Sequence, residues 1–259
     1  MDIYFGIIIF LIGIIFGSFF NVCIFRIPNN KSVSYPPSHC YNCNTRLKII
    51  DLIPVLSWIF LRGKCRYCGS KISIRYPLIE LLTGIIFLIV YKTNGINIML
   101  IYYLMLSSIL IIITFIDIDF YIIPDNLIII GCIFALVFKV LNHISIVSSI
   151  LGGLICGGGM YILIVLIESI VKQEVMGGGD IKLFAMIGVF LGIRGGLLTI
   201  LLSIYIGAIY GVITMIYNKY KNRSYKSVIP YGPFIAIAAF ISIAYCDKII
   251  HWYIKIIMI

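Results

Sequence analysis

Charged residues are scarce in this sequence, and acidic residues are the scarcest of them. Asp, Glu, Lys and Arg make up 12% of the 259 residues, and only 10 residues are acidic. Soluble domains carry about 25% charged residues and are about 45–50% apolar. This chain is 62% hydrophobic with a mean hydropathy of +1.12, and long apolar stretches recur throughout. The composition therefore excludes an ordinary soluble domain and predicts an all-α polytopic membrane protein.

A basic segment is missing where a cleaved signal peptide would carry one. Only Asp2 stands before the first apolar stretch, 3–23, and no small-residue cleavage site follows it. We therefore expect this stretch to be the first transmembrane helix. The Lys and Arg residues cluster after it, with nine of them between Arg26 and Arg75. Such a cluster beside a membrane span is typical of a cytosolic loop, so the net charge of +10 does not indicate nucleic-acid binding.

Apolar runs separated by glycine, proline and charged residues predict about eight transmembrane helices. We place them near 3–25, 77–91, 98–116, 126–141, 144–171, 181–193, 195–217 and 229–250. With the N-terminus outside, the loops 26–76, 117–125, 172–182 and 218–228 lie in the cytosol and hold most of the Lys and Arg residues. The expected domains are a first helix (1–25), a loop domain (26–76) and a helical bundle (77–259).

Small residues spaced four apart occur in three of these segments. The pairs are Gly13 with Gly17, Gly153 with Gly157, and Gly207 with Gly211. This spacing lets two helix backbones approach closely in lipid, so we expect helix contacts at each pair.

The loop 26–76 contains two Cys-x-x-Cys pairs with 21 residues between them. The pairs are Cys40 with Cys43 and Cys65 with Cys68. Four thiolates in two close pairs are typical of a closed, structural zinc site. Asn44 and Gly69 follow the two pairs and tolerate the left-handed turn that such a site needs. The sequence therefore predicts a zinc ion that stabilises the cytosolic loop and leaves no open coordination position.

Two acidic positions stand at the cytosolic edges of predicted spans. Asp180 follows Gly177 to Gly179, and Asp117 and Asp119 follow the apolar run 98–116. An acid in this setting usually faces a cavity or a partner, and two carboxyl groups that share a proton can activate water. Because one residue separates Asp117 from Asp119, the two side chains point in different directions on a helix, and the pattern does not decide which one faces Asp180. Asp180 could instead cap the helix that it begins.

Two further charged residues lie near these features. Lys182, just after the glycines, is a candidate to bind substrate or to position the loop. Glu80 follows Arg75-Tyr76-Pro77 and is a candidate to pair with a basic residue of the loop 26–76.

A series of motifs, in one order along almost the whole chain, resembles the bacterial type IV prepilin peptidases, which are GxGD aspartic membrane proteases. Besides the two Cys pairs, the matching stretches are Gly17-Ser18-Phe19-Phe20-Asn21-Val22, Leu56-Ser57-Trp58, Arg62-Gly63-Lys64-Cys65-Arg66, Ile74-Arg75-Tyr76-Pro77-Leu78-Ile79-Glu80-Leu81, Ile116-Asp117-Ile118-Asp119, Met176 to Leu183, and Pro230-Tyr231-Gly232-Pro233-Phe234. Ile123-Pro124-Asp125 stands where the family has Leu-Pro-Asp, and Tyr231 stands where phenylalanine is commoner.

The resemblance implies roles for the acidic residues that the pattern leaves open. It makes Asp117 and Asp180 the catalytic pair and leaves Asp119, Gly177, Gly179 and Lys182 in support. It also implies a second activity, because the four-Cys site is usual in the members that methylate the new N-terminus with S-adenosylmethionine. The chain shows no glycine-rich Rossmann signature, so this cofactor is expected from the resemblance alone.

The expected protein is an endopeptidase of the inner membrane that acts at the cytosolic membrane face. By resemblance, it would cut the basic leader after Gly from type IV prepilins and pseudopilins and then methylate the new N-terminus. Its expected partners are these substrates and membrane lipid. The alternatives are a protease without methyltransferase activity, a GxGD protease of another class, and a proton-coupled transporter or zinc-braced scaffold, since paired intramembrane acids also suit a proton relay.

Overall fold

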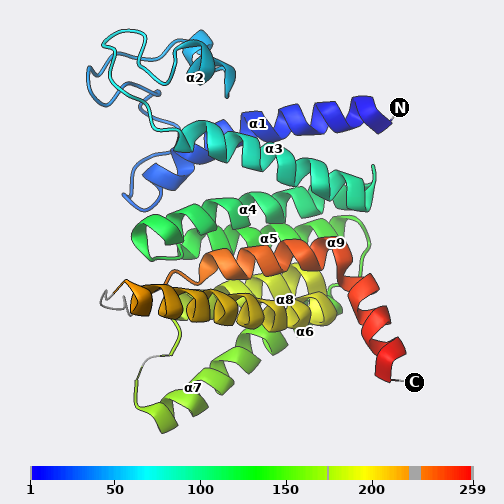
Figure 1. Ribbon diagram of the computed structural model, residues 1–259. Helices are drawn as coiled ribbons and strands as arrows, with labels where there is room; N and C mark the ends of the chain where they lie inside the picture. Colours follow the sequence, from blue (N-terminus) through cyan, green and yellow to red (C-terminus); the bar gives the residue numbers. More distant parts are fainter. Residues whose placement is uncertain (1, 174, 222–228, 258–259) are drawn as a thin grey trace. The chain divides into compact units, whose positions relative to one another are not determined.

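The computed structural model describes residues 2–173, 175–221 and 229–257, and within these it contains helices, turns and two isolated β-bridges (Figure 1). The prediction of an all-α protein is confirmed. Of the predicted loop 218–228, residues 222–228 lie outside the described part. In chain order the helices are α1 (Asp2–Arg26), the 3₁₀-helix η1 (Ile49–Leu52), α2 (Leu56–Phe60), α3 (Arg75–Asn94), α4 (Ile98–Phe120), α5 (Asp125–Leu141), α6 (Val147–Gly153), the π-helix η2 (Leu154–Gly158), α7 (Gly159–Val171), α8 (Gly178–Tyr220) and α9 (Gly232–Ile257).

Six helical segments of the described chain are long and apolar enough to cross a membrane. They are α1, α3, α4, the continuous stretch Val147–Val171, α8 and α9. The 17-residue helix α5 is not one of them. The predicted count of eight spans therefore stays a prediction, although every predicted span corresponds to a helix or part of one.

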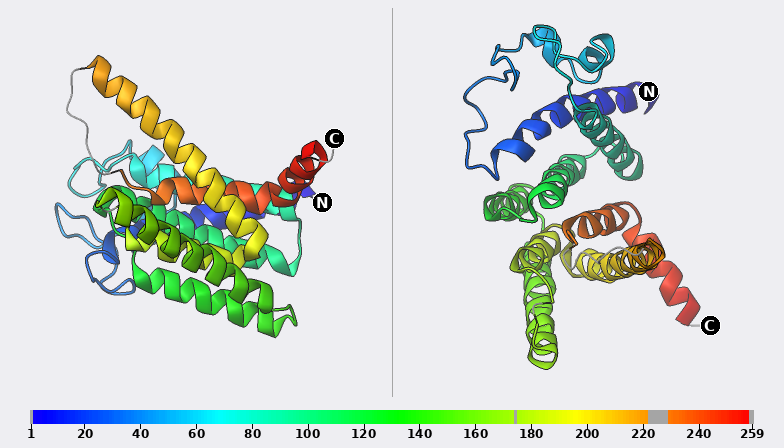
Figure 2. Two further views of the ribbon diagram at one scale, coloured as in Figure 1. Left: turned by 90° about the horizontal axis from the view of Figure 1, so that it is seen from below. Right: turned by 60° about the vertical axis from the view of Figure 1, so that its left-hand side comes forward.

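The chain divides into two compact units, Met1–Ile112 and Ile113–Ile259, and α4 begins in the first and ends in the second. In the first unit α1 and α3 lie side by side (Figures 1 and 2). A Cβ atom on Gly13 would lie 2.7 Å from the Gly84 Cα atom, and one on Gly17 would lie 2.7 Å from the Glu80 Cα atom. The predicted close approach at Gly13 and Gly17 is therefore confirmed. The chain between α1 and α3, with η1 and α2, forms the loop domain.

In the second unit, α6 and η2 pack against the first part of α8. Gly152 and Gly188 meet backbone to backbone, and a Cβ on Gly157 would lie 2.5 Å from the Ala185 Cβ atom. Contacts this close admit no side chain, which confirms the prediction for Gly153 and Gly157 as a packing face. The third pair is only half confirmed: Gly207 faces Tyr231, whereas a Cβ on Gly211 would meet no described atom within 4 Å.

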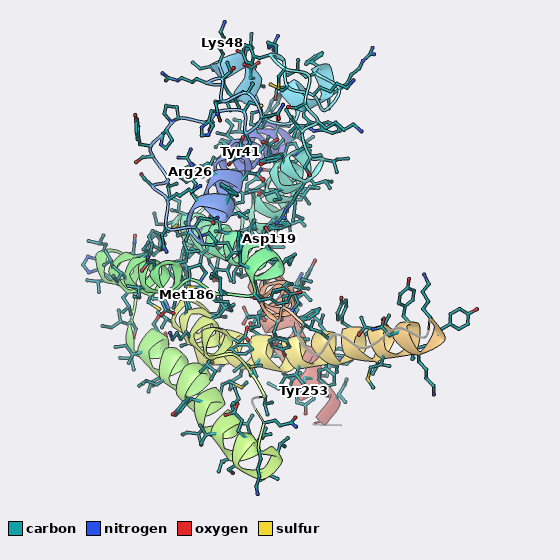
Figure 3. The ribbon with its side chains drawn as sticks, turned by 90° about the vertical axis from the view of Figure 1, so that its left-hand side faces the viewer. Arg26, Tyr41, Lys48, Asp119, Met186 and Tyr253 are labelled. Atoms are coloured by element: carbon teal, nitrogen blue, oxygen red, sulfur yellow. The ribbon has the colours of Figure 1, made fainter. Side chains whose placement is uncertain are left out.

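Helix α8 folds back on itself at Gly192. This residue has φ 68° and ψ −172°, a left-handed conformation that favours glycine. A Cβ on Gly196 would lie 3.2 Å from the Gly188 Cα atom, whereas residues eight apart in a straight helix are separated by about 12 Å. The predicted spans 181–193 and 195–217 are the two arms of this hairpin. Helix α9 packs on α8, and Met186 lies within this unit while Tyr253 projects outward from α9 (Figure 3).

Candidate active site and metal centre

Asp117 lies in the last turns of α4, after a segment in which Ile109 to Ile113 and Ile116 are buried. Its side chain is only 6% exposed. The backbone N–H of Gly232, the first residue of α9, donates a hydrogen bond of 2.7 Å to Asp117 Oδ2. A Cβ atom on Gly232 would lie 2.8 Å from the same oxygen. Glycine at this position therefore lets the start of α9 come close enough to hold the carboxyl group through its backbone.

Asp180 lies in the first turn of α8. The residue preceding this helix is Gly177, whose carbonyl accepts a hydrogen bond of 3.0 Å from the Asp180 N–H. The alternative role of Asp180 as the helix cap is therefore wrong, because the helix begins at Gly178. A Cβ on Gly177 would lie 3.3 Å from Asp180 Oδ2, and one on Gly179 would lie 3.0 Å from the Ile123 Cβ atom. Two of the three glycines thus have a neighbour at a tight contact distance, and a Cβ on Gly178 would meet no described atom within 4 Å.

The structure brings Asp117 and Asp180 together within the second unit. The two carboxyl groups are close enough to interact electrostatically, and Asp180 also interacts with Tyr231. Tyr231 stands directly before Gly232, and its hydroxyl oxygen lies 3.4 Å from Ser203 Oγ of α8. The ends of α4, α8 and α9 therefore build one site, with two acids and a backbone donor in it. Such a pair can activate water, one group as base and the other as acid.

The remaining predicted residues lie around this pair. Asp119, labelled in Figure 3, is exposed where Asp117 is buried, so the two side chains do point in different directions. Asp117 is the one that interacts with Asp180. Lys182 Nζ lies 2.8 Å from both carboxylate oxygens of Asp125, the first residue of α5. Both side chains of this ion pair are more than half exposed, so it joins α5 to α8 at little gain in stability.

The four predicted cysteines form one cluster in the loop domain. All four Sγ atoms lie within 4.8 Å of one another. The two Cys pairs have matching turns: the N–H of Asn44 donates to the Cys40 carbonyl and the N–H of Gly69 donates to the Cys65 carbonyl. Asn44 (φ 53°) and Gly69 (φ 71°) have the left-handed conformation that the sequence predicts. The cluster can hold one metal ion, since sulfur atoms around a tetrahedral ion lie about 3.8 Å apart.

Polar neighbours prepare two of these thiols for metal binding. The Ser70 hydroxyl, 3.1 Å from Cys68 Sγ, and the Ser70 backbone N–H lower the pKa of the Cys68 thiol to about 6. The backbone N–H groups of Cys43 and Asn42 lower the pKa of Cys40. Thiolate is the form that binds a metal, so these hydrogen bonds favour the bound state.

Two contacts were missed by reasoning from residue types alone. The donor to Asp117 is a backbone group, and its only signal is the glycine within Pro230-Tyr231-Gly232-Pro233. The expected basic partner of Glu80 is wrong: its carboxylate accepts the Val55 N–H at 2.7 Å and a hydrogen bond from Ser18.

Comparison with known proteins covers nearly the whole chain. The family model described as "Bacterial Peptidase A24 N-terminal domain" matches residues 11–93, and the one described as "Type IV leader peptidase family" matches residues 104–212. A protein of Bacillus subtilis named "Prepilin leader peptidase/N-methyltransferase" is 36% identical over 248 residues, which cover 96% of this chain and 97% of that protein.

Proteins of the same name from two other bacteria are also similar to this chain. The one from Aeromonas hydrophila is 32% identical over 272 residues, covering 95% of this chain and 92% of its own length. The one from Legionella pneumophila is 36% identical over 222 residues, covering 85% of this chain and 76% of its own length. No solved structure gives a significant match.

Proposed function

This chain belongs to the type IV leader peptidase family, and from that premise we propose that it is a membrane aspartic endopeptidase that also methylates its product. It cuts the basic leader after Gly from type IV prepilins and pseudopilins. It then transfers a methyl group from S-adenosylmethionine to the new N-terminus. Leader cleavage and N-methylation are the two activities that the relatives' names state. The observation that carries the protease half is the juxtaposition of Asp117 and Asp180, with the Gly232 N–H on Asp117.

Peptide hydrolysis follows from the chemistry of two neighbouring carboxyl groups. The ionised aspartate takes a proton from water, and the protonated one donates to the carbonyl oxygen or the leaving amine. Two adjacent negative charges repel, which keeps one proton on the pair. The Gly232 N–H donates to Asp117 Oδ2 and so fixes one lone pair of that carboxyl group. The other oxygen remains for water or for the shared proton.

The glycine turn before α8 gives substrate backbone access to Asp180. Gly178 borders open space, so an extended peptide can pass close to the main chain there. Lys182 and Asp119 support the site from outside the pair, Lys182 through its ion pair with Asp125. A prepilin presents an apolar helix in the bilayer and its leader beyond it, which puts the scissile bond at the membrane edge.

We infer the orientation from charge and the loop's role from its thiols. The excess of Lys and Arg in the predicted cytosolic loops favours an inner-membrane protein with its N-terminus outside and its active site on the cytosolic side. We propose three parts: a first transmembrane helix (1–25), a cytosolic zinc domain (26–76) and a helical bundle (77–259) that carries the aspartates. Zinc suits four thiolates, and Cys40, Cys43, Cys65 and Cys68 would fill its coordination shell. The ion would then stabilise the loop without taking part in the reaction.

The experiment uses purified full-length protein, S-adenosylmethionine and a prepilin-like peptide with a basic leader that ends in Gly. Mass spectrometry reports cleavage after Gly and the gain of one methyl group on the new N-terminus. The proposal is supported if the parent cuts and methylates the peptide. Asp117→Asn and Asp180→Asn, given the same uncut peptide, should then do neither. Cleavage without a methyl group leaves the protease alone. Failure to cut several such leaders favours a proton relay or a scaffold.

A further inference from the structure

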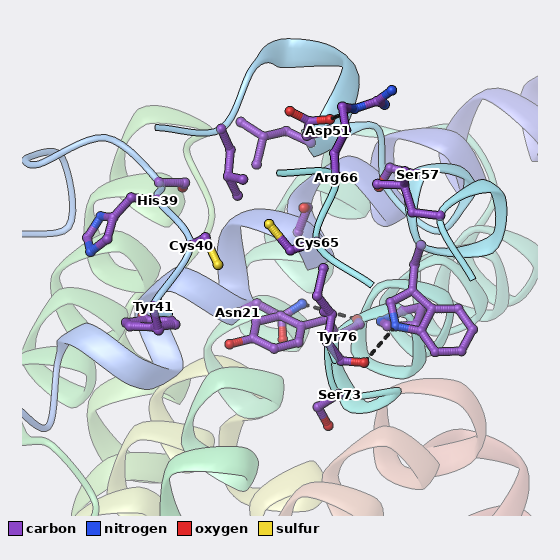
Figure 4. Close-up of a pocket in the computed structure, with 18 of the residues that line it drawn as sticks. Asn21, His39, Cys40, Tyr41, Asp51, Ser57, Cys65, Arg66, Ser73 and Tyr76 are labelled. Atoms are coloured by element: carbon purple, nitrogen blue, oxygen red, sulfur yellow. Dashed lines mark hydrogen bonds and ion pairs between the residues drawn. The ribbon is translucent and has the colours of Figure 1, made fainter. Parts of the chain in front are cut away.

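A pocket of about 510 Å³ lies in the first unit, between α1, the start of α3 and the two Cys pairs. Its volume falls within the range of small-molecule sites, about 300–1,000 Å³. Figure 4 shows Asn21 and Tyr76 at its centre, Cys40 and Cys65 side by side above them, and His39 and Tyr41 along one edge. None of its lining residues belongs to the unit that contains the aspartate pair.

The pocket wall carries charged groups of both signs, Arg26, Asp51, Arg66, Lys71 and Glu80. The Arg66 Nε atom lies 2.6 Å from Asp51 Oδ1 in an ion pair at the rim (Figure 4). Arg26 is buried and donates to the backbone carbonyls of Ser32, Val33 and Pro36. Glu80 is the buried acid of this wall: it is 6% exposed, and among the described residues its hydrogen bonds come from neutral groups, the Val55 N–H and Ser18.

Glu80 therefore places a buried carboxyl group without an ion-pair partner among the described residues in the pocket wall. No described Lys or Arg forms an ion pair with it. A buried charge without a counter-charge is costly, and a ligand that brings a positive charge would offset that cost.

The aromatic side chains around this carboxylate suit a cation and a nucleobase. Tyr41, Trp58 and Tyr76 all line the pocket. Trp58 is held in place: its Nε1–H donates to the Ile72 carbonyl at 3.1 Å, and its ring packs on Gly63, where a Cβ would lie 2.9 Å away. Aromatic faces attract weakly hydrated cations that carry methyl groups, and flat bases stack on them.

We propose that this pocket binds the methyl donor S-adenosylmethionine, with Glu80 facing a positive group of the donor and Trp58 and Tyr76 contacting its adenine or sulfonium centre. The inference rests on the proposed methyltransferase function. The donor supplies its methyl group from a sulfonium sulfur, which becomes a neutral thioether as the bond breaks, and the accepting amine loses one proton. The chain has no Rossmann signature, so the donor needs a site of another kind, and this pocket has the size, the rings and the charge for one.

Binding is measurable without turnover, because the chain has only two tryptophans. Trp252→Phe removes the one on α9, which is 65% exposed, and leaves Trp58 as the reporter in the pocket wall. We expect S-adenosylmethionine to change the fluorescence of the full-length Trp252→Phe protein saturably. Glu80→Gln in that background should weaken binding at least tenfold. The matched acid variant Asp247→Asn, at an exposed position of α9, should bind as the parent does.

Two further measurements separate recognition of charge from a general loss of structure. Glu80→Gln should weaken S-adenosylmethionine more than S-adenosylhomocysteine, the thioether that lacks the sulfonium charge, while peptide cleavage persists. Ser57→Phe, which places a ring in the pocket, should abolish binding of both in titration calorimetry.

The outcomes distinguish the pocket from the function on which it rests. If the parent methylates its product while Glu80→Gln and Ser57→Phe bind the donor normally, the assignment of the donor to this pocket is refuted. The methyltransferase function is unaffected by that result. A parent that cuts its substrate but neither binds the donor nor methylates would overturn the methyltransferase proposal and the pocket with it.

Discussion

The Gly232 N–H fixes the position of Asp117, so Gly232→Ala should reduce the rate of cleavage without unfolding the protein. The added Cβ would lie 2.8 Å from Asp117 Oδ2, 3.2 Å from its Cβ and 3.3 Å from its Cγ. Ordinary contacts begin near 3.4 Å, so the carboxyl group must retreat by several tenths of an ångström. Gly232 does not have a positive φ, so alanine can adopt its backbone conformation without strain.

The size of the effect follows from what the retreat disrupts. A hydrogen bond to a charged group contributes about 1.5–3 kcal/mol, and a misplacement of about 1 Å in an active site can cost about 100-fold in rate. Since about 1.4 kcal/mol is tenfold in rate, we expect kcat to fall by about 10- to 100-fold. KM should change little, because the substitution acts on the Asp117 carboxyl group, the proposed catalytic group, and not on a proposed substrate contact.

The assay is steady-state cleavage of the leader peptide, with kcat and KM determined separately and thermal unfolding followed in the same detergent. Gly158→Ala is the matched control: it changes a glycine of the second unit that has no part in the proposed site, and its Cβ would meet no described atom within 4 Å. We expect it to stay within about threefold of the parent. If Gly232→Ala cleaved as fast as Gly158→Ala, the positioning role of Gly232 would be refuted.

Three further predictions concern packing, the metal and the exposed ion pair. Gly188→Ala places a methyl group against the Gly152 backbone and should destabilise the protein by about 1–3 kcal/mol in thermal unfolding, whereas Gly158→Ala, with open space at its Cβ, should not. The parent should contain about one zinc ion per chain by elemental analysis, and Cys65→Ser should lose it; a metal-free parent would contradict the four-thiolate site. Lys182→Met breaks an ion pair with Asp125 that is more than half exposed, so the free energy of unfolding should change by less than about 1 kcal/mol; a larger loss would mean that this pair stabilises the join between α5 and α8.

Features with a local cause were predictable from the sequence. The Cys-x-x-Cys turns depend on four or five consecutive residues, so the left-handed conformations of Asn44 and Gly69 could be predicted from the residue types. The glycines at Gly13, Gly17, Gly153 and Gly157 mark helix faces in contact, because only glycine permits backbones so close. The break at Gly192 lies two residues before the predicted boundary between the spans 181–193 and 195–217.

Features that join distant parts of the chain were not predictable from residue types. Asp117 and Asp119 cannot be told apart by their spacing. What distinguishes Asp117 is the hydrogen bond from the N–H of Gly232, which lies more than a hundred residues later in the chain. The sequence predicts a basic partner for Glu80. In the fold, its carboxylate instead accepts a hydrogen bond from the backbone N–H of Val55 in the loop domain. The role of Gly211 in packing was inferred from spacing alone, and a Cβ at that position would meet no described atom within 4 Å.

The most direct test of the account is the cleavage rate of Asp117→Asn, Asp180→Asn and Asp119→Asn on the same leader peptide, with each variant shown to be folded by thermal unfolding. Asparagine keeps the shape of the side chain and removes its acid–base function. Acid–base groups contribute about 10²- to 10⁴-fold each, so Asp117→Asn and Asp180→Asn should lose at least about 10²-fold, while Asp119→Asn stays within about tenfold of the parent. Appreciable cleavage by Asp117→Asn together with an inactive Asp119→Asn would contradict the assignment and move the catalytic role to Asp119.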